Sequence, residues 1–334
     1  MKKNSLIKSV IIFTLFLMLI HGASMAADIT LKLGHVAPVG PTTHDVSAQK
    51  FAERVAVNTN GKVEVKVFGN SQFGNLMEHW SQLKVGAIDL FVQDAGAAFM
   101  PEPKPKNFII TLFPYVFESQ KHFHNFVKSD LFKSMMAKVE KAANIKYLGY
   151  AGDRTPRGFS TTNKRVTIPD DIKGLKLRVP PVPPFVAAYK AWGANPTPVA
   201  AKEIYSALKS GMVMGMDQDL TMTYAAKYYE IQKYFIAVNY MRSGMGIWMN
   251  ADKWVSLPED VQTAMLKSVE ETEIYVNDFT AKQMVDAKKG LTEAGVEIVY
   301  PDLQPWMKAA EQSVIKIEGK MWEKGLYDKV KALK

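Results

Sequence analysis

The sequence predicts an α/β protein of two domains, and three observations support this prediction. Segments with the alternating apolar pattern of half-buried strands take turns with segments whose apolar residues recur at helical spacing, an order typical of α/β folds. The chain has 334 residues, more than a single domain of about 150 residues usually contains. Hydrophobic residues make up 47% and charged residues 22% of the chain, a globular composition that argues against disorder.

The first segment is typical of a secretory signal peptide. Lysines at positions 2, 3 and 8 precede an apolar run at 10–20, and mostly small residues follow at 24–27. An apolar run of 11 residues is too short to cross a bilayer of ~30 Å as a helix. We therefore expect residues 1–26 to be removed and the mature protein to be soluble in the periplasm. An uncleaved membrane anchor is the alternative.

The residue counts exclude several classes of protein. The chain has no cysteine, which excludes disulfides, thiolate metal sites, cysteine nucleophiles and a lipoprotein anchor. Residues 1–26 hold three lysines and no acidic residue, so without them the formal net charge falls from +9 to +6. Basic and acidic residues are mixed along the chain, so we expect no nucleic-acid partner. The positive surplus suits solubility or the attraction of an anionic ligand.

The first α/β set begins after the signal peptide. The strand at 29–33 alternates apolar and polar residues, Thr42 or Thr43 can cap the helix that follows, and Asn60-Gly61 can close it. The same two patterns predict a strand over 63–67, a helix near 78–85, a strand over 87–92, a helix near 120–143 and a strand over 145–150.

The second α/β set begins near Arg157. Leu175, Leu177 and Val179 alternate with polar residues, as in a half-buried strand. The predicted elements are a strand over 175–179, a helix over 184–192, a helix over 202–209 that ends at Gly211, and strands over 235–239 and 245–249.

A long helix follows the second set. It opens at 256–260, with Pro258 in the first turn and acidic residues near the positive end of the helix dipole. It runs almost to Gly290 without Pro or Gly, roughly 45 Å at 1.5 Å per residue, so it could cross between domains. The predicted domains are 27–153 with 242–283 and 154–241 with 284–334, joined by short strand crossovers that act as a hinge.

Motifs of catalysis and cofactor binding are absent from the sequence. It has no phosphate-binding loop, dinucleotide fingerprint or Gly-x-Ser-x-Gly elbow, so we expect no cofactor, no metal and no catalytic residue. His35 and His44 flank a turn at 38–41 after the first strand, where α/β proteins place ligand sites. We include His35 among the expected ligand-binding residues; an ordinary loop histidine is the alternative.

Two arginines suit an anionic ligand. Arg178 lies on the strand at 175–179, on the face opposite its apolar residues, and Arg157 precedes a short stretch of small and β-prone residues. A guanidinium can hold a carboxylate through two hydrogen bonds, so two convergent arginines favour an organic anion. A solvated surface position is the alternative for Arg178.

Short motifs occur in a fixed order along the mature chain. They are LGHVAP at 33–38, TNGKV at 59–63, QFG at 72–74, GAID at 86–89, FPYVF at 113–117, IPDDIKGLKLRVP at 168–180, GANPTP at 193–198, EIYSALKSG at 203–211 and WVSLPE at 254–259. Each motif alone is weak, but their co-linear occurrence is specific. Together they resemble the TRAP transporter solute-binding proteins, the DctP-like family, over essentially the whole mature chain.

The resemblance implies a two-domain periplasmic binding protein that closes like a clam shell on a ligand in a central cleft, with the long helix spanning both domains. It implies a receptor and not an enzyme. The receptor binds a small organic carboxylate and delivers it to the membrane subunits of a TRAP permease driven by an ion gradient, and we expect it to be a monomer. A receptor that presents ligand to a membrane sensor kinase is the first alternative, and a periplasmic enzyme is the second.

The resemblance also assigns ligand-binding residues. It gives Arg178 the role of the carboxylate clamp and Arg157 that of an assisting arginine. Arg154 is the alternative to Arg157, because the spacing to Asn163 differs slightly from the usual one. Glu78 matches an acidic residue that is frequent in the pockets of the family.

The segment at 213–219 departs from the family pattern Val-Asp-Gly-Gln-Glu-Asn-Pro. Gln218 stands in the place of the Asn that often contacts the ligand, and methionines replace two polar residues. Asp217 and Asp219 could meet an ammonium group if they point inward. Alternatively, one of them faces solvent and the other caps the helix that follows.

Five apolar residues are candidates for the wall of the ligand site: Phe113, Tyr115, Met214, Met216 and Trp248. They favour an aromatic or branched-chain acid, amino acids included, over a sialic acid or a short dicarboxylate. The alternative is that these side chains pack in the core.

Overall fold

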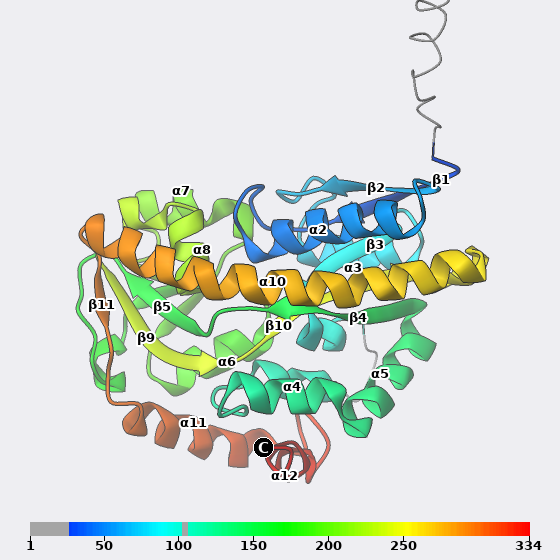
Figure 1. Ribbon diagram of the computed structural model, residues 1–334. Helices are drawn as coiled ribbons and strands as arrows, with labels where there is room; N and C mark the ends of the chain where they lie inside the picture. The colour runs from blue at the N-terminus through cyan, green and yellow to red at the C-terminus, as the bar shows by residue number, and fades with distance from the viewer. Residues whose placement is uncertain (1–26, 102–105) are drawn as a thin grey trace, which may run out of the picture.

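A computed structural model of the chain describes residues 27–101 and 106–334 and contains two β-sheets joined by a long helix (Figure 1). The predicted signal peptide at 1–26 lies outside the described residues. The first sheet has five strands in the order β2-β1-β3-β10-β4. These are β1 (Ile29–Gly34), β2 (Val63–Phe68), β3 (Leu90–Asp94), β4 (Ile145–Asp153) and β10 (Gly244–Asn250). β1 pairs parallel with β2 and β3, whereas β10 pairs antiparallel with β3 and β4.

The first strand–helix–strand unit forms where the sequence predicts it. Leu31 and Leu33 of β1 are fully buried and the residues between and before them are exposed, because successive side chains of a strand point to opposite faces. Helix α2 (Thr43–Asn58) begins after Thr42, whose side chain accepts a hydrogen bond from the backbone of the first turn. The chain then reverses at Gly61, which adopts a φ of 79°.

Two elements of the first half differ from the prediction. β3 begins at Leu90 instead of residue 87, because Gly86 adopts a φ of 73° and turns the chain first. The helix expected over 120–143 is two helices, α4 (Gln120–Lys128) and α5 (Asp130–Ala143). Ser129 between them is extended, and its hydroxyl oxygen caps the start of α5. Helix α3 (Leu76–Lys84) forms close to its predicted range.

The second sheet has six strands in the order β11-β9-β5-β8-β6-β7. These are β5 (Arg157–Thr161), β6 (Lys176–Val179), β7 (Asn195–Pro198), β8 (Gly215–Asp219), β9 (Tyr234–Met241) and β11 (Glu297–Val299). β7, β8 and β11 were not expected from the pattern. All five residues of β8 are buried because it lies inside the sheet, so no alternation marks it in the sequence.

Shorter helices connect the strands and cover the sheets. Helices α6 (Pro183–Ala191) and α7 (Ile204–Lys209) match predictions. Those not predicted are α8 (Leu220–Ala225), α9 (Ala251–Ser256), α11 (Gln304–Ile317), α12 (Leu326–Lys331) and the 3-10 helices η2 (Ala95–Phe99), η3 (Asn107–Leu112), η4 (Pro169–Ile172), η5 (Ala201–Glu203) and η6 (Tyr228–Glu230). Within the described ranges, no helix has both the length and the apolar character of a membrane span.

Helix α10 (Glu259–Glu293) is 35 residues long and crosses the full width of the molecule (Figure 1). Near its start it packs against α2, where Arg54 and Glu271 form an ion pair of 2.6 Å. Near its end it packs against α8, so closely that a Cβ at Gly290 would lie 2.2 Å from the Tyr224 ring. The expectation of a helix that spans both halves is confirmed, although Pro258 precedes the first helical residue.

Two short crossings connect the sheets, at 154–156 and at 242–243, and helix α10 carries the chain once more from the first sheet to the second. The two crossings lie side by side, since the Arg154 amide donates to the Ser243 carbonyl at 3.1 Å. After α11 the chain returns to the part of the molecule built around the first sheet. There the side chain of Asn125 on α4 donates to the Leu333 carbonyl at 3.0 Å. The predicted boundaries assign this last segment to the second domain, and they remain a prediction.

We predict that Asn277 on α10 fixes the end of β4. Its Oδ1 accepts from the Asp153 amide at 2.7 Å, so Asn277→Ala should lower the free energy of unfolding by about 1 kcal/mol. Asp278→Ala is the matched control, because among the described residues that exposed side chain pairs only with Lys282; it should change stability by less than about 0.5 kcal/mol. Urea denaturation measures both, and equal losses would contradict the role of Asn277.

Candidate ligand-binding site

A cavity of about 160 Å³ lies between the two sheets. The first sheet contributes the residues at the end of β3, and the second contributes residues of β5, β6 and β8. Its volume is comparable to an engineered protein cavity of ~150 Å³ that binds benzene. The site therefore suits a small molecule.

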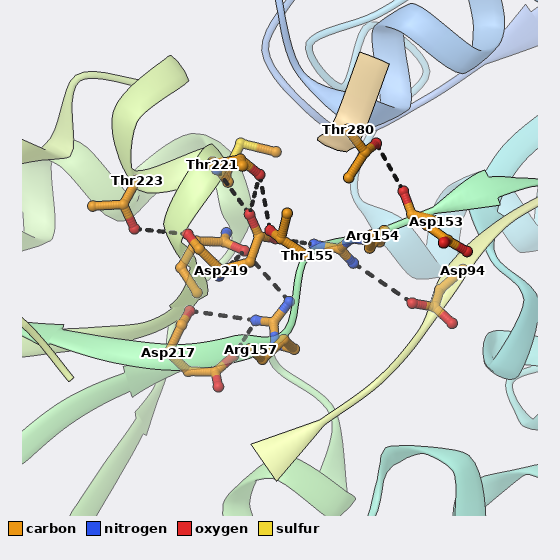
Figure 2. A network of polar contacts seen from close by, with 12 residues as sticks. Asp94, Asp153, Arg154, Thr155, Arg157, Asp217, Asp219, Thr221, Thr223 and Thr280 are labelled. Atoms are coloured by element: carbon orange, nitrogen blue, oxygen red, sulfur yellow. Dashed lines mark hydrogen bonds and ion pairs between the residues drawn. The ribbon is translucent and has the colours of Figure 1, made fainter. Parts of the chain in front are cut away.

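Arg157 lines the cavity and is already paired. Its guanidinium donates to the Asp217 carboxylate from Nε at 3.0 Å and also from Nη2 (Figure 2). The same carboxylate accepts hydrogen bonds from the hydroxyls of Tyr189, at 2.9 Å, and Tyr240. Burial alone would lower the pKa of Arg157, but the Asp217 charge raises it above its ordinary value. Arg157 is thus a cation whose charge is matched within the protein.

Arg154 links the two sheets at the first crossing. Its Nη2 donates to Asp219 Oδ2 at 2.7 Å, and its Nη1 lies 3.6 Å from Asp94 Oδ2 at the end of β3 (Figure 2). Asp219 also caps α8 by accepting from the Met222 amide at 2.8 Å. Burial opposes ionisation of Asp219, but the charges of Arg154 and Arg157 hold its pKa below the ordinary value.

Arg178 differs from the other two arginines because it has no acidic partner within the described part of the chain. Its Nε donates to the Val199 carbonyl at 2.9 Å and its Nη1 to the Asp217 carbonyl at 3.4 Å. Only 3% of the residue is exposed. Burial lowers the pKa of Arg178 to about 10, so the side chain is still a cation near pH 7. It presents an unmatched positive charge to the cavity.

Two polar residues from the part of the molecule built around the first sheet also line the cavity. Asp94 ends β3, and its Oδ1 accepts from the Gly96 amide at 3.0 Å. His44 lies in the first turn of α2 and lines the same cavity. Burial, followed by the charge of Arg154, lowers the pKa of His44 well below its ordinary value, so its imidazole is neutral. His44 flanks the turn at 38–41, where the sequence predicts a ligand site, whereas no sequence pattern indicates Asp94.

The remaining wall of the cavity is largely apolar. It includes Met100, Leu112, Phe185, Met222 and Met241. Such side chains exclude water from the charged groups, and methionine adapts its shape to a ligand more easily than branched residues do.

Three of the ten expected ligand-binding residues line the cavity, namely Arg178, Arg157 and Gln218. The alternative arginine, Arg154, lines it as well. Gln218 lies beside Arg157, whose Nη1 is 3.4 Å from its Oε1. Asp217 is fully buried and serves as the partner of Arg157. Neither Asp217 nor Asp219 faces solvent, and Asp219 is the helix cap that the sequence offered as an alternative.

Two polar residues do not line the cavity, because local hydrogen bonds hold their side chains. The carboxylate of Glu78 accepts from the Asn75 amide at 2.6 Å in a capping box at the start of α3. His35 is fully buried, with Nε2 at 3.0 Å from Asp45 Oδ1.

The apolar candidates do not line the cavity either, because they pack elsewhere. Phe113 packs edge-on against Trp322, and the Tyr115 hydroxyl donates to the Val238 carbonyl at 3.0 Å. Trp248 packs between Trp80 and Tyr147 in the core.

The two methionines of the departing segment are also absent from the wall. Met216 is fully buried in a cluster with Ile204 and Tyr228, and those two side chains line the cavity in its place. Met214 is likewise outside the lining. The predicted preference for an aromatic or branched-chain acid therefore loses the residues on which it was based.

Comparison with known proteins gives a match to one family over most of the chain. The sequence model of the bacterial extracellular solute-binding proteins, family 7 (DctP), matches residues 33–320. The chain belongs to this family. The resemblance to TRAP transporter solute-binding proteins and the predicted two-domain α/β fold are thereby confirmed.

Individual members agree with this assignment over nearly their whole length. The chain is 30% identical to a C4-dicarboxylate-binding periplasmic protein from Rhodobacter capsulatus, over 87% of this chain and 86% of that protein. A TRAP periplasmic solute-binding protein from Sulfurospirillum deleyianum, solved with bound succinate, is 28% identical with a TM-score of 0.83, over 92% of this chain and 100% of that one. One from Roseobacter denitrificans, solved with bound L-galactonate, is 25% identical with a TM-score of 0.81, over 92% and 99%. Membership confirms the prediction of a receptor and not an enzyme.

We predict that Trp248 supports the fold of this family 7 protein without contacting ligand. Trp248→Phe should lower stability by about 1–2 kcal/mol through lost packing and the lost hydrogen bond to the Gln93 carbonyl. It should leave ligand affinity within twofold. Phe185→Leu, at the cavity wall, should weaken binding instead. Thermal unfolding and calorimetry separate the effects, and a large affinity loss in Trp248→Phe would contradict the placement.

Proposed function

We propose that the chain is the extracytoplasmic receptor of a TRAP-type secondary transporter and binds a small organic carboxylate through Arg178. The single observation that carries this proposal is the unmatched charge of Arg178 in the cavity. A ligand carboxylate would supply the missing acidic partner and would match the planar guanidinium through two hydrogen bonds. The relatives support the ligand class, because succinate, L-galactonate and the C4-dicarboxylates named for those proteins are all carboxylates.

The energetics of burial support the same assignment. A buried charge without a partner costs several kcal/mol, and this cost is removed when a well-placed opposite charge arrives. The apolar wall strengthens the attraction, because electrostatic interactions grow as water is excluded. The cavity of the free protein therefore favours an anion before any specific contact is considered.

Arg157 and Gln218 would act as assisting residues. The charge of Arg157 is matched by Asp217, so it would offer hydrogen bonds and not a second free charge. Gln218, held beside it, would offer an amide to the polar groups of the ligand.

Domain closure, delivery to a membrane permease and export to the periplasm are the remaining parts of the proposed function. The domains 27–153 with 242–283 and 154–241 with 284–334 would close on the ligand by bending at the paired crossings, where Arg154 meets Ser243. The closed, monomeric receptor would then deliver the ligand to the membrane permease. The pattern of residues 1–26 supports export to the periplasm.

We predict that two arginine variants separate binding from folding. Arg178→Met should weaken carboxylate binding by at least ~100-fold, since losing one member of a buried ion pair costs about 3–5 kcal/mol. It should leave the free protein at least as stable as the wild type, because no ion pair among the described residues is lost. Arg157→Met should destabilise the fold by about 3–5 kcal/mol, because it leaves Asp217 unpaired.

A thermal-shift screen of carboxylates would supply the probe for this test. Calorimetry with the strongest hit then gives the affinities, and Arg178→Lys serves as the conservative variant, which should also bind poorly because an ammonium lacks the planar fork. Wild-type affinity in Arg178→Met would refute the assigned role. Conversion of the hit to a product by the purified protein would argue for an enzyme instead.

A further inference from the structure

The cavity holds a second buried charged group that the proposed function does not use. Asp94 is 5% exposed and lines the cavity from the first sheet, whereas Arg178 lines it from the second. Among the described residues, nothing donates a hydrogen bond to Asp94 Oδ2. Its nearest cation is Arg154, whose Nη1 lies 3.6 Å away, while Nη2 of the same side chain is bonded to Asp219 at 2.7 Å.

The charges around the cavity therefore do not cancel locally. Arg157 is matched by Asp217 and Arg154 by Asp219, which leaves a positive charge at Arg178 and a negative charge at Asp94. The remaining charged residue of the lining, Lys202, is exposed. A ligand with a single negative charge would neutralise only one end of this arrangement.

A second polar atom near the acidic end also has no partner. His44 Nδ1 is buried and has no hydrogen-bond partner among the described residues. His44 lines the cavity from the same half of the molecule as Asp94. A neutral imidazole nitrogen can accept a hydrogen bond, so this side of the cavity offers a carboxylate oxygen together with an imidazole nitrogen.

From this arrangement we propose that the ligand is a zwitterion, whose carboxylate meets Arg178 and whose cationic nitrogen donates to Asp94 Oδ2. The proposal rests on the proposed function and adds the chemistry of the second end. A buried acid opposes a second carboxylate in the ligand, because like charges at close range are costly in a site that excludes water. The chain should accordingly discriminate against dicarboxylates such as succinate, which a relative binds.

The test compares ligands that differ only at the second group. One series holds the donor at increasing distance from the carboxylate: 3-aminopropanoate, 4-aminobutanoate, 5-aminopentanoate and 6-aminohexanoate, each with its terminal hydroxy analogue, its unsubstituted alkanoate and its dicarboxylate. The other holds the donor next to the carboxylate: leucine, 2-hydroxy-4-methylpentanoate and 4-methylpentanoate. Calorimetry on protein freed of ligand by unfolding and refolding gives the affinities.

Asp94→Asn is the test variant, because it removes the charge and keeps an oxygen that can accept from the Gly96 amide. Asp130→Asn, at a fully exposed side chain, is the matched control. We expect at least one amino compound to bind the wild type 10-fold or more tightly than its hydroxy and alkanoate counterparts. Asp94→Asn should abolish that preference and improve dicarboxylate binding, while Asp130→Asn changes neither.

Two results would overturn the inference. If the hydroxy or alkanoate compounds bind as tightly as the amino compounds, or if Asp94→Asn leaves the preference intact, the ligand is not held by a cationic nitrogen at Asp94, and the proposed function still stands. If no carboxylate of either series binds, or if binding is unaffected by Arg178→Met, the proposed function fails and the inference fails with it.

Discussion

Three arginine side chains are buried where the two sheets meet, and the acids around them determine what the cavity can hold. Asp217 matches Arg157 and Asp219 matches Arg154, whereas Arg178 is bonded only to backbone carbonyls in the described structure. Because an unmatched buried charge is costly, the free protein carries a cost that, under the proposed function, an anionic ligand would remove. The stability of the fold and the selectivity of the site thus depend on the same few groups.

The same charges connect the site to the joint between the two halves. Arg154 lies on the first crossing, contacts acids from both sheets and hydrogen bonds through its amide to the second crossing at Ser243. Next to it, Thr280 of α10 donates to the Asp153 carbonyl (Figure 2), and Asn277 of the same helix accepts from the Asp153 amide. A change in the spacing of the sheets would therefore alter the ion pairs of Arg154 and the contacts of the long helix together. Under the proposed function, this coupling would link ligand binding to domain closure.

Periodicity predicts the elements that expose one face and hide the other. Leu31 and Leu33 mark β1 because their neighbours are exposed, and α10 is marked by its uninterrupted length. β8 escapes this reasoning because every residue in it is buried. The site is only partly predictable for a related reason. The sequence shows that Trp248 is apolar, but only the packing of the folded chain determines whether such a side chain lies in the core or lines the cavity. No sequence pattern indicates that Asp94 lines the cavity, since its position there depends on where β3 ends relative to β6.

A crystal structure of the chain with a bound carboxylate selected by thermal shift would test the role of Arg178 most directly. We expect both carboxylate oxygens to lie within about 2.7–3.2 Å of guanidinium nitrogens of Arg178, with the Arg157–Asp217 pair unchanged. A carboxylate bound elsewhere in the cavity, with Arg178 still bonded only to carbonyl groups, would contradict this role.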